Sequence, residues 1–312
     1  FPYTTLFRSK LDFSTRTNAF TLSCVGNETI YGDIVLGSGI SVSGTVTVTL
    51  SGRNTQIITS AGKTLTWNIT VDSYGGTVEL ADALNIGTRF ITITNGTFDT
   101  KNFNVTASYL LSSNSNVRTI NFGSSTVTLS DTANTSFATI TNLTFNAGTS
   151  TIILSGSSTG TILSSGGLTF YNVTLSSTTS GNSPVISGNN TFNNFTVTAP
   201  AAAGLIGMRF SGNNIINGTL TVAGATPVRR VFVRSDTLGT TRTLTVNSLS
   251  ATDCDFRDIT IAGAAAGSSP TRAGNCGGNT GITFPVAKTV YWNLAGTQNW
   301  SATAWAPSSG GT

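Results

Sequence analysis

Histidine is absent from this sequence of 312 residues, and its absence restricts the chemistry that the chain can perform. Histidine is the commonest metal ligand in proteins and the commonest general base near neutral pH. Many classes of enzyme are therefore excluded. No cofactor is expected from the composition.

Charge is also scarce. Only 9% of the residues are charged, against roughly 25% in ordinary soluble domains. Ser, Thr, Asn and Gly fill the polar positions, and Thr favours strands because its β-branch packs well on a pleated surface. The 38% of hydrophobic residues recur in short alternating runs, which argues against disorder. No run of about 18 apolar residues exists, so no membrane span is predicted.

The net charge of +4 comes mainly from arginine. Seven arginines lie between Arg209 and Arg272, a mild basic bias near one end of the chain. Scattered surface arginines are favoured over a patch for an anionic ligand, because nucleic-acid binders cluster their basic residues more densely. Nucleic acid is therefore not an expected partner.

An internal repeat underlies the short strands. The segments SGNNTFNNFTV at 187–197 and SGNNIINGTL at 211–220 share a frame of an apolar residue, Asn, Thr and a second apolar residue. The frame recurs around Asn142, Asn172, Asn194 and Asn217, and the unequal intervals between these asparagines each match one coil of a β-helix. Constant strands with loops of variable length are typical of a solenoid, whereas a β-sandwich gives no reason to repeat the same Asn and Thr.

We therefore predict an all-β, right-handed parallel β-helix with coils of about 20–30 residues. Phe170, Phe192, Ile215 and Phe256 should point into one continuous core. The four frame asparagines should stack near one corner, where Asn tolerates the left-handed conformation and its amides can hydrogen-bond up the solenoid.

The repeats resemble those of large β-solenoid proteins of phage virions and bacterial surfaces, including tail-fibre-like and adhesin-like proteins. The motifs that carry this resemblance are GTVTVTLSG at 44–52, GSSTVTLS at 123–130, GTSTIILSG at 148–156, the two SGNN units and YWNLAGTQNWSATAW at 291–305.

The resemblance implies a fragment of a longer chain that acts as a rigid spacer and binding surface. Its expected location is extracellular, on a cell surface or in a virion. The expected partners are a surface polysaccharide and neighbouring modules of the same chain, with a homotrimer as one assembly to consider.

One acid cluster provides the alternative of a polysaccharide lyase or glycoside hydrolase on a β-helix. These enzymes use clustered carboxylates, or carboxylates that hold Ca²⁺ beside a basic residue. Asp253 and Asp255 are the candidate Ca²⁺ ligands, and Arg257 and Asp258 complete the candidate catalytic group. A structural interpretation is favoured, because Asp258 falls on the Asn position of the repeat frame, where it would replace a corner asparagine.

Cys254 and Cys276 lie about one coil apart in the sequence, so stacking would bring them onto neighbouring turns. A disulfide between them and a pair of free thiols are equally compatible with this spacing.

The two ends of the chain differ from the repeats. Residues 1–9 resemble translated sequencing-adaptor read-through at the end of a metagenomic reading frame, and we exclude them from the fold. Residues 10–286 form the predicted β-helix, and residues 287–312 form a cap or inter-module linker. This last segment contains Trp292, Trp300 and Trp305. The alternative to a cap or linker is that these rings form an aromatic platform that binds sugar.

Ice binding is a third, minor alternative, because Thr-x-Thr ladders on a flat solenoid face can order water. Candidate ladders occur at 45–49, 64–66, 92–94, 126–128 and 241–245. Their uneven spacing along the chain argues against one regular array.

Overall fold

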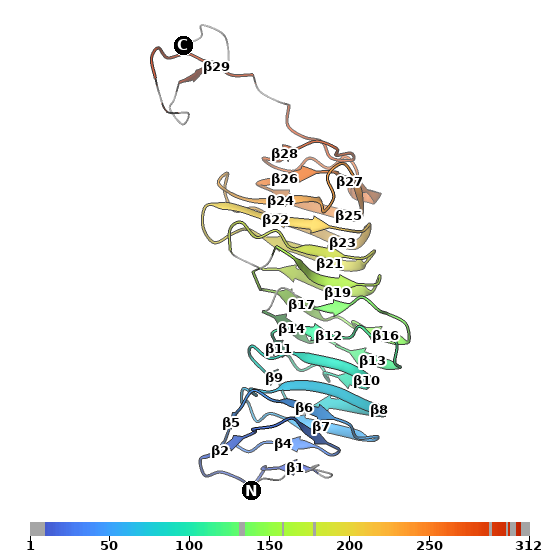
Figure 1. Cartoon of the computed structure of the whole chain (residues 1–312). Helices are drawn as coiled ribbons and strands as arrows, with labels where there is room; N and C mark the ends of the chain where they lie inside the picture. The colour runs from blue at the N-terminus through green and yellow to red at the C-terminus, as the bar shows by residue number, and fades with distance from the viewer. Residues whose placement is uncertain are drawn as a thin grey trace.

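Short parallel strands stack in chain order along one long axis, from the N-terminal coils to the C-terminal coils (Figure 1). The structure is a computed structural model, and it describes residues 10–130, 135–157, 159–176, 179–286, 289–297, 299 and 304–306. The predicted all-β parallel solenoid is confirmed, with about 12 turns. None of the described residues form a helix with the length and apolar character needed to cross a lipid bilayer.

Two sheets run along the solenoid. The first sheet contains seventeen strands: β1 (Leu11–Asp12), β3 (Glu28–Ile30), β4 (Ile34–Val35), β6 (Thr47–Leu50), β7 (Thr55–Thr59), β8 (Asn68–Leu80), β10 (Ile91–Asp99), β12 (Leu110–Leu111), β13 (Arg118–Asn121), β15 (Ser136–Phe137), β16 (Leu143–Asn146), β18 (Thr161–Ser165), β20 (Val185–Ser187), β22 (Gly204–Phe210), β24 (Arg229–Ser235), β26 (Cys254–Arg257) and β28 (Gly274–Asn275).

The second sheet contains nine strands: β9 (Leu84–Asn85), β11 (Val105–Ala107), β14 (Thr126–Leu129), β17 (Thr151–Leu154), β19 (Thr169–Leu175), β21 (Thr191–Thr198), β23 (Asn214–Ala223), β25 (Arg242–Thr252) and β27 (Ile259–Ala262). A small parallel pair, β2 (Phe20–Ser23) with β5 (Ile40–Ser43), accompanies the first coils, and one 3-10 turn, η1 (Gly263–Ala265), follows β27.

Residue alternation explains why these segments form strands. In β14 the side chains of Val127 and Leu129 are buried, while the two threonines between and before them face outward. Thr126 pairs in register with Thr151 of the following coil, and Thr151 pairs in turn with Asn172 of the coil after that. Because side chains in a strand alternate between faces, the register holds apolar residues over apolar residues from coil to coil.

The core is one continuous cluster that extends from Ile30 to Ala265. A chain of touching aromatic rings lies inside it. Phe170 and Phe192 stack with centroids 5.7 Å apart, and Phe192 meets Phe195 edge-on at 5.0 Å. Ring contacts on either side extend this chain from Phe122 to Phe210. Each coil thus buries its apolar face only against its neighbours, as expected of a solenoid.

Three of the four predicted core residues, Phe170, Phe192 and Phe256, are buried at 1% exposure or less, but the prediction for Ile215 was wrong. Ile215 is 45% exposed, and Ile216 takes the inward position opposite Phe192. The register shifts between Ile216 and Thr219, so one extra residue lies in this strand as a β-bulge. The frame places its apolar residues five apart, as Phe192 and Val197 are, whereas the inward residues of β23 alternate regularly through Ile216 and Leu220, so the frame failed here.

The predicted asparagine stack exists for one pair only. Asn172 and Asn194 are aligned, and the Asn194 amide donates to Oδ1 of Asn172 at 3.0 Å. The bulge removes Asn217 from this column, and Asn142 precedes β16 in the first sheet, so the prediction that all four share a corner was wrong. Asn142 does adopt the left-handed conformation, with φ of 57°, at its own corner.

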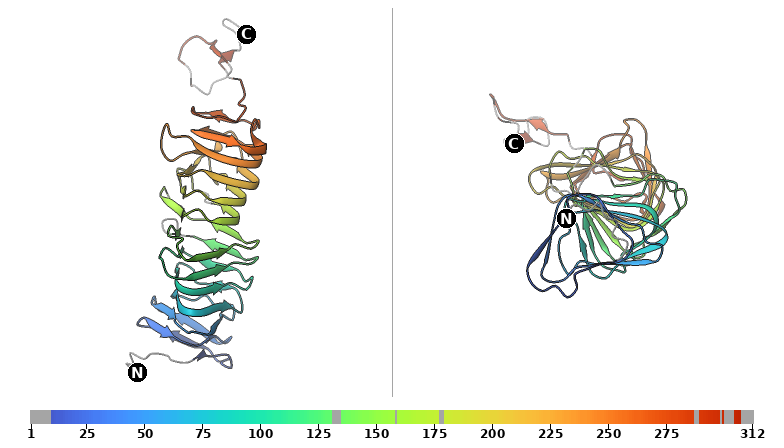
Figure 2. Two further views of the ribbon diagram at one scale, coloured as in Figure 1. Left: turned by 90° about the vertical axis from the view of Figure 1, so that its right-hand side faces the viewer. Right: turned by 60° about the horizontal axis from the view of Figure 1, so that its bottom comes forward.

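The chain stays on the stack as far as Phe284, whose ring contacts Phe256, and then forms a short antiparallel pair, β29 (Tyr291–Trp292) with β30 (Trp305–Ala306) (Figures 1 and 2). This pair belongs to the segment predicted as a cap or linker. Residues 1–9 and Trp300 lie outside the described residues.

Candidate functional site

The acid cluster lies where the last coils of the solenoid turn. Asp253 separates β25 from β26, and Asp258 separates β26 from β27. Both have left-handed backbones, with φ of 47° and 56°, and short polar side chains such as Asp tolerate this conformation best after Gly. Asp258 therefore does occupy a corner. Asp253 is a second corner and does not share a strand face with Asp255.

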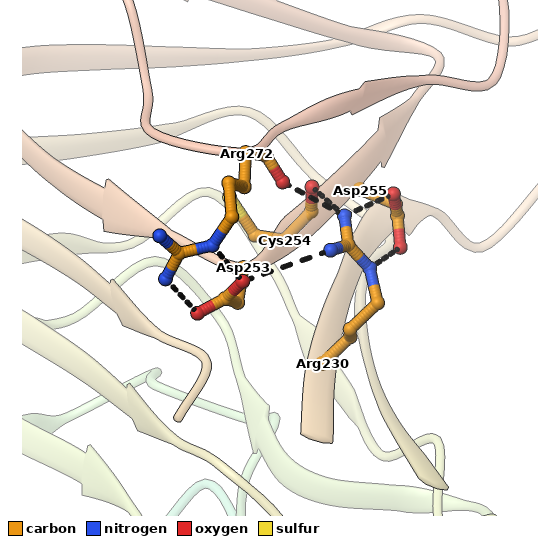
Figure 3. Close-up of polar contacts among 5 residues, drawn as sticks. All are labelled: Arg230, Asp253, Cys254, Asp255 and Arg272. Atoms are coloured by element: carbon orange, nitrogen blue, oxygen red, sulfur yellow. Dashed lines mark hydrogen bonds and ion pairs between the residues drawn. The ribbon is translucent and has the colours of Figure 1, made fainter. Parts of the chain in front are cut away.

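The side chain of Asp253 is 1% exposed and is held by Arg272 (Figure 3). The Arg272 guanidinium donates from Nε to Oδ1 and from Nη2 to Oδ2, both at 2.6 Å. Arg230 Nη1 lies 3.9 Å from the same carboxylate. The hydrogen bonds from Arg272, with its positive charge, lower the pKa of Asp253.

Asp255 makes a second bidentate pair, with Arg230 of β24. Arg230 donates from Nε to Oδ2 at 2.9 Å and from Nη2 to Oδ1 at 2.7 Å. It also donates to the carbonyl oxygens of Cys254 and Arg272, so one guanidinium joins neighbouring coils (Figure 3). The hydrogen bond with Asp255 raises the pKa of Arg230.

Asp258 accepts a hydrogen bond from the Gly239 backbone N–H at 3.1 Å and forms an ion pair with Arg257 at 3.3 Å. Each of the three candidate carboxylates is thus occupied by an arginine. A general acid for glycoside hydrolysis needs a raised pKa, whereas the pKa of Asp253 is lowered. A Ca²⁺ ion at Asp253 and Asp255 would have to displace two bidentate arginines. The arrangement is suited to joining coils.

The two C-terminal cysteines are free thiols, so the predicted disulfide alternative was wrong. Cys254 is buried and points into the core, whereas Cys276 is exposed. They do lie on neighbouring coils, but Asp255 pairs with Gly274 and Phe256 with Asn275, which offsets the two cysteines along the strands. Burial raises the pKa of the Cys254 thiol to about 12.

Trp292 and Trp305 face each other across the C-terminal pair. Their rings meet edge-on, with centroids 5.3 Å apart and planes inclined at 82°. Trp292 is 39% exposed. An edge-to-face pair stabilises a small hairpin, whereas a sugar platform requires a ring face open to the ligand.

A buried arginine was not foreseen from the sequence. Arg118 in β13 is 1% exposed and donates five hydrogen bonds to hydroxyl and carbonyl oxygens. Its acceptors belong to Ser112, Asn116, Thr139 and Thr141, so it joins loops of adjacent coils. Nothing in the sequence distinguishes Arg118 from a surface arginine, because its acceptors are mainly backbone carbonyls.

A second amide ladder was also missed. The Asn146 amide donates to Asn121 at 2.7 Å, and the Asn121 amide donates to Asp99 at 3.2 Å. With Lys101, Asn102, Gly123 and Gly148 these side chains line an open depression. The repeated Asn-x-Gly at 121–123 and 146–148 is the sequence signal for this amide ladder, because both glycines take the left-handed conformation at corners of successive coils.

The second sheet carries two outward columns of side chains, polar except for Ile153 and two residues apart along each strand, which we name the hydroxyl-amide face. One column is Thr126, Thr151, Asn172 and Asn194. The other is Thr106, Thr128, Ile153, Thr174, Thr196, Thr221 and Ser250.

The Thr pairs considered for ice binding do not all join this face. Thr126 and Thr128 belong to it, whereas Thr49 and Thr92 form a separate column with Thr70 in the first sheet. The pairs counted along the sequence therefore do not form one array. The hydroxyl-amide face is built largely from residues outside those pairs.

Comparisons with known proteins identify no relative. No family model, no curated protein and no solved structure matches the chain.

Proposed function

We propose that this chain is a non-catalytic structural β-solenoid that works outside a cell, as a rigid spacer with a polysaccharide-binding surface in a tail-fibre-like or adhesin-like protein. The observation that carries the proposal is the unbroken core from Ile30 to Ala265. A core without a break along the axis resists bending, because every coil is packed on two neighbours.

The hydroxyl-amide face supports the binding role. Its outward hydroxyls and amides repeat at the spacing between strands, roughly 4.8 Å, over at least seven coils. Hydroxyl and amide groups donate and accept hydrogen bonds, as sugar hydroxyls do. A linear neutral polysaccharide lying along the axis would meet at least one hydroxyl or amide group at each of these coils.

The runner-up, a polysaccharide-degrading enzyme, is less favoured because Asp253, Asp255 and Asp258 are each held by an arginine. A cleavage assay distinguishes the two functions. Incubation with neutral and acidic polysaccharides should release no new chain ends. Cleavage that Asp255→Asn abolishes without changing the melt would establish the enzyme instead.

Small-angle X-ray scattering tests the spacer role on the full chain. About 12 turns at ~4.8 Å each give a rod of about 60 Å before the C-terminal segment is added. The expected profile has one constant cross-section. Affinity electrophoresis through dextran should show retardation that Thr174→Tyr with Thr196→Tyr removes. A globular profile, or retardation unchanged by that double variant, would contradict the proposal.

Ice binding is a third, minor candidate, and the observation that favours it is the in-register columns of the hydroxyl-amide face. Most of the Thr-x-Thr pairs lie elsewhere, but the threonines of this face align in space although the loops between them differ in length. Thermal hysteresis of the wild-type protein that Thr196→Tyr suppresses would support it. Freezing at the melting point, with no hysteresis, would exclude ice binding.

A further inference from the structure

A basic patch lies on the first sheet, apart from the hydroxyl-amide face. Between residues 209 and 272 the chain contains seven arginines and four aspartates, with no lysine or glutamate, for a net charge of +3. The whole chain has a net charge of +4. Most of the excess positive charge is therefore concentrated in the last coils.

The four aspartates each occupy one arginine. Asp236 pairs with Arg242, Asp253 with Arg272, Asp255 with Arg230 and Asp258 with Arg257. Within the described part of the chain, Arg209, Arg229 and Arg234 have no carboxylate partner. The excess charge therefore resides on three identified guanidiniums.

Two of these three arginines, Arg209 and Arg234, lie in register with the paired Arg257 on neighbouring strands. Arg209 of β22 pairs with Arg234 of β24, and Arg234 pairs with Arg257 of β26. We name these three residues the arginine ladder. Its members come from consecutive coils, at the strand spacing of roughly 4.8 Å. Like charges directly opposite one another repel, so this register is unfavourable unless another group compensates it.

The ladder is held in place. Arg209 donates from Nε to the Ser183 carbonyl at 2.8 Å and from Nη2 to the Thr159 carbonyl, and Arg234 donates to the Ser183 hydroxyl at 3.0 Å. The Phe232 ring lies 5.2 Å from the Arg234 guanidinium and 5.7 Å from that of Arg257. Ser183 fits closely because Gly207 has no side chain, and a Cβ there would collide with the Ser183 hydroxyl.

Arg257 is paired with Asp258, but among the described residues no carboxylate pairs with Arg209 or Arg234, so two charges of the ladder are left without a counter-charge. Carbonyl oxygens, a hydroxyl and a ring face orient the guanidiniums but contribute no formal negative charge. The Arg234 Nε is buried and has no hydrogen-bond acceptor. Burial and then the charges of Arg257 and Arg209 lower the pKa of Arg234. An external anion would relieve this repulsion.

We propose that the arginine ladder is a binding site for the carboxylate or sulfate groups of a linear acidic polysaccharide that lies along the solenoid axis. The planar guanidinium fork matches an oxyanion in a bidentate geometry. The Phe232 ring contacts both the Arg234 and the Arg257 guanidiniums and so keeps these two donors in neighbouring positions. Three arginines in a single column favour a single charged chain over a nucleic acid duplex, because duplex binders neutralise many closely spaced phosphates with denser clusters of basic residues.

This site is separate from the hydroxyl-amide face, so its test is independent of the proposed spacer role. The full chain is titrated with polygalacturonate, dextran sulfate and neutral dextran at low and at physiological salt. Arg209→Gln with Arg234→Gln removes two ladder charges. Arg16→Gln with Arg53→Gln is the matched control, because both are exposed arginines that lie over aromatic rings in the N-terminal coils.

Affinity for the two acidic polysaccharides should fall by about tenfold or more in the ladder variant and by less than about threefold in the control. Binding of neutral dextran should be the same in both. An equal loss in the two variants would overturn the proposal, since it would show unspecific attraction to net charge. Tighter binding of a DNA oligonucleotide with the same ladder dependence would assign the site to nucleic acid instead.

A second variant keeps the proposal testable if the glutamines disturb folding. Arg209→Lys with Arg234→Lys retains both charges but loses the bidentate fork. We expect it to fold and to bind the acidic polysaccharides more weakly than the wild type. Wild-type affinity in this folded lysine variant would overturn the assignment of an oxyanion-specific guanidinium site.

Discussion

Replacing Phe192 by alanine should be among the most damaging single changes to this solenoid. The Phe192 ring is completely buried and contacts Phe170 in the preceding coil and Phe195 in its own strand. Loss of this ring removes buried apolar surface and leaves a cavity that the neighbouring core side chains cannot fill. The expected cost is about 3–5 kcal/mol in the free energy of unfolding.

The consequences should remain local at first. Solenoid stability is approximately a sum of coil and interface terms, so the coils around β21 lose the most. Urea unfolding followed by circular dichroism measures the total cost, and hydrogen exchange shows which amides lose protection.

Ile215→Ala is the matched control, because Ile215 lies in the next coil, beside the residue that pairs with Phe192, but is 45% exposed. We expect that variant to lose less than about 1 kcal/mol. Equal losses for the two substitutions would refute the inward position of Phe192 and the outward position of Ile215.

Four further predictions concern the other buried or paired groups. Arg118→Met should cost about 3 kcal/mol or more in a urea melt, because several buried carbonyl and hydroxyl oxygens lose the donor that Arg118 supplies. Asp255→Ala should cost about 1.5–3 kcal/mol by the same measurement, since it leaves a half-buried arginine unpaired; a loss near zero would contradict this role. The lowered pKa of Asp253 means that its contribution to stability is present above about pH 4 and is lost as the pH falls through the lower folded-state pKa, so Asp253→Asn should flatten the acid limb of a pH-dependent melt. Iodoacetamide should modify Cys276 in the native protein and Cys254 only after unfolding, and a reductant should leave the melting temperature unchanged.

Much of the solenoid could be predicted from local pattern alone. Alternation of apolar and hydroxyl residues, as in Val127 and Leu129 between threonines, determines which side chains face inward, because side chains in a strand alternate with a period of two. The repeat of Phe170 and Phe192 predicted the core ladder, and the alignment of Asp258 with a frame asparagine predicted its corner. These features depend on residues close together in the chain.

The tertiary structure decided what depends on register between coils. Ile215 faces outward because β23 has one more residue than β21 between its inward side chains, so Ile216 and not Ile215 lies opposite Phe192. Arg209, Arg234 and Arg257 are unequally spaced along the chain, and only the intervening loops determine that they meet. The sequence alone establishes which residues each coil contributes. The lengths of the loops set the register between coils, and this register determines which residues become neighbours.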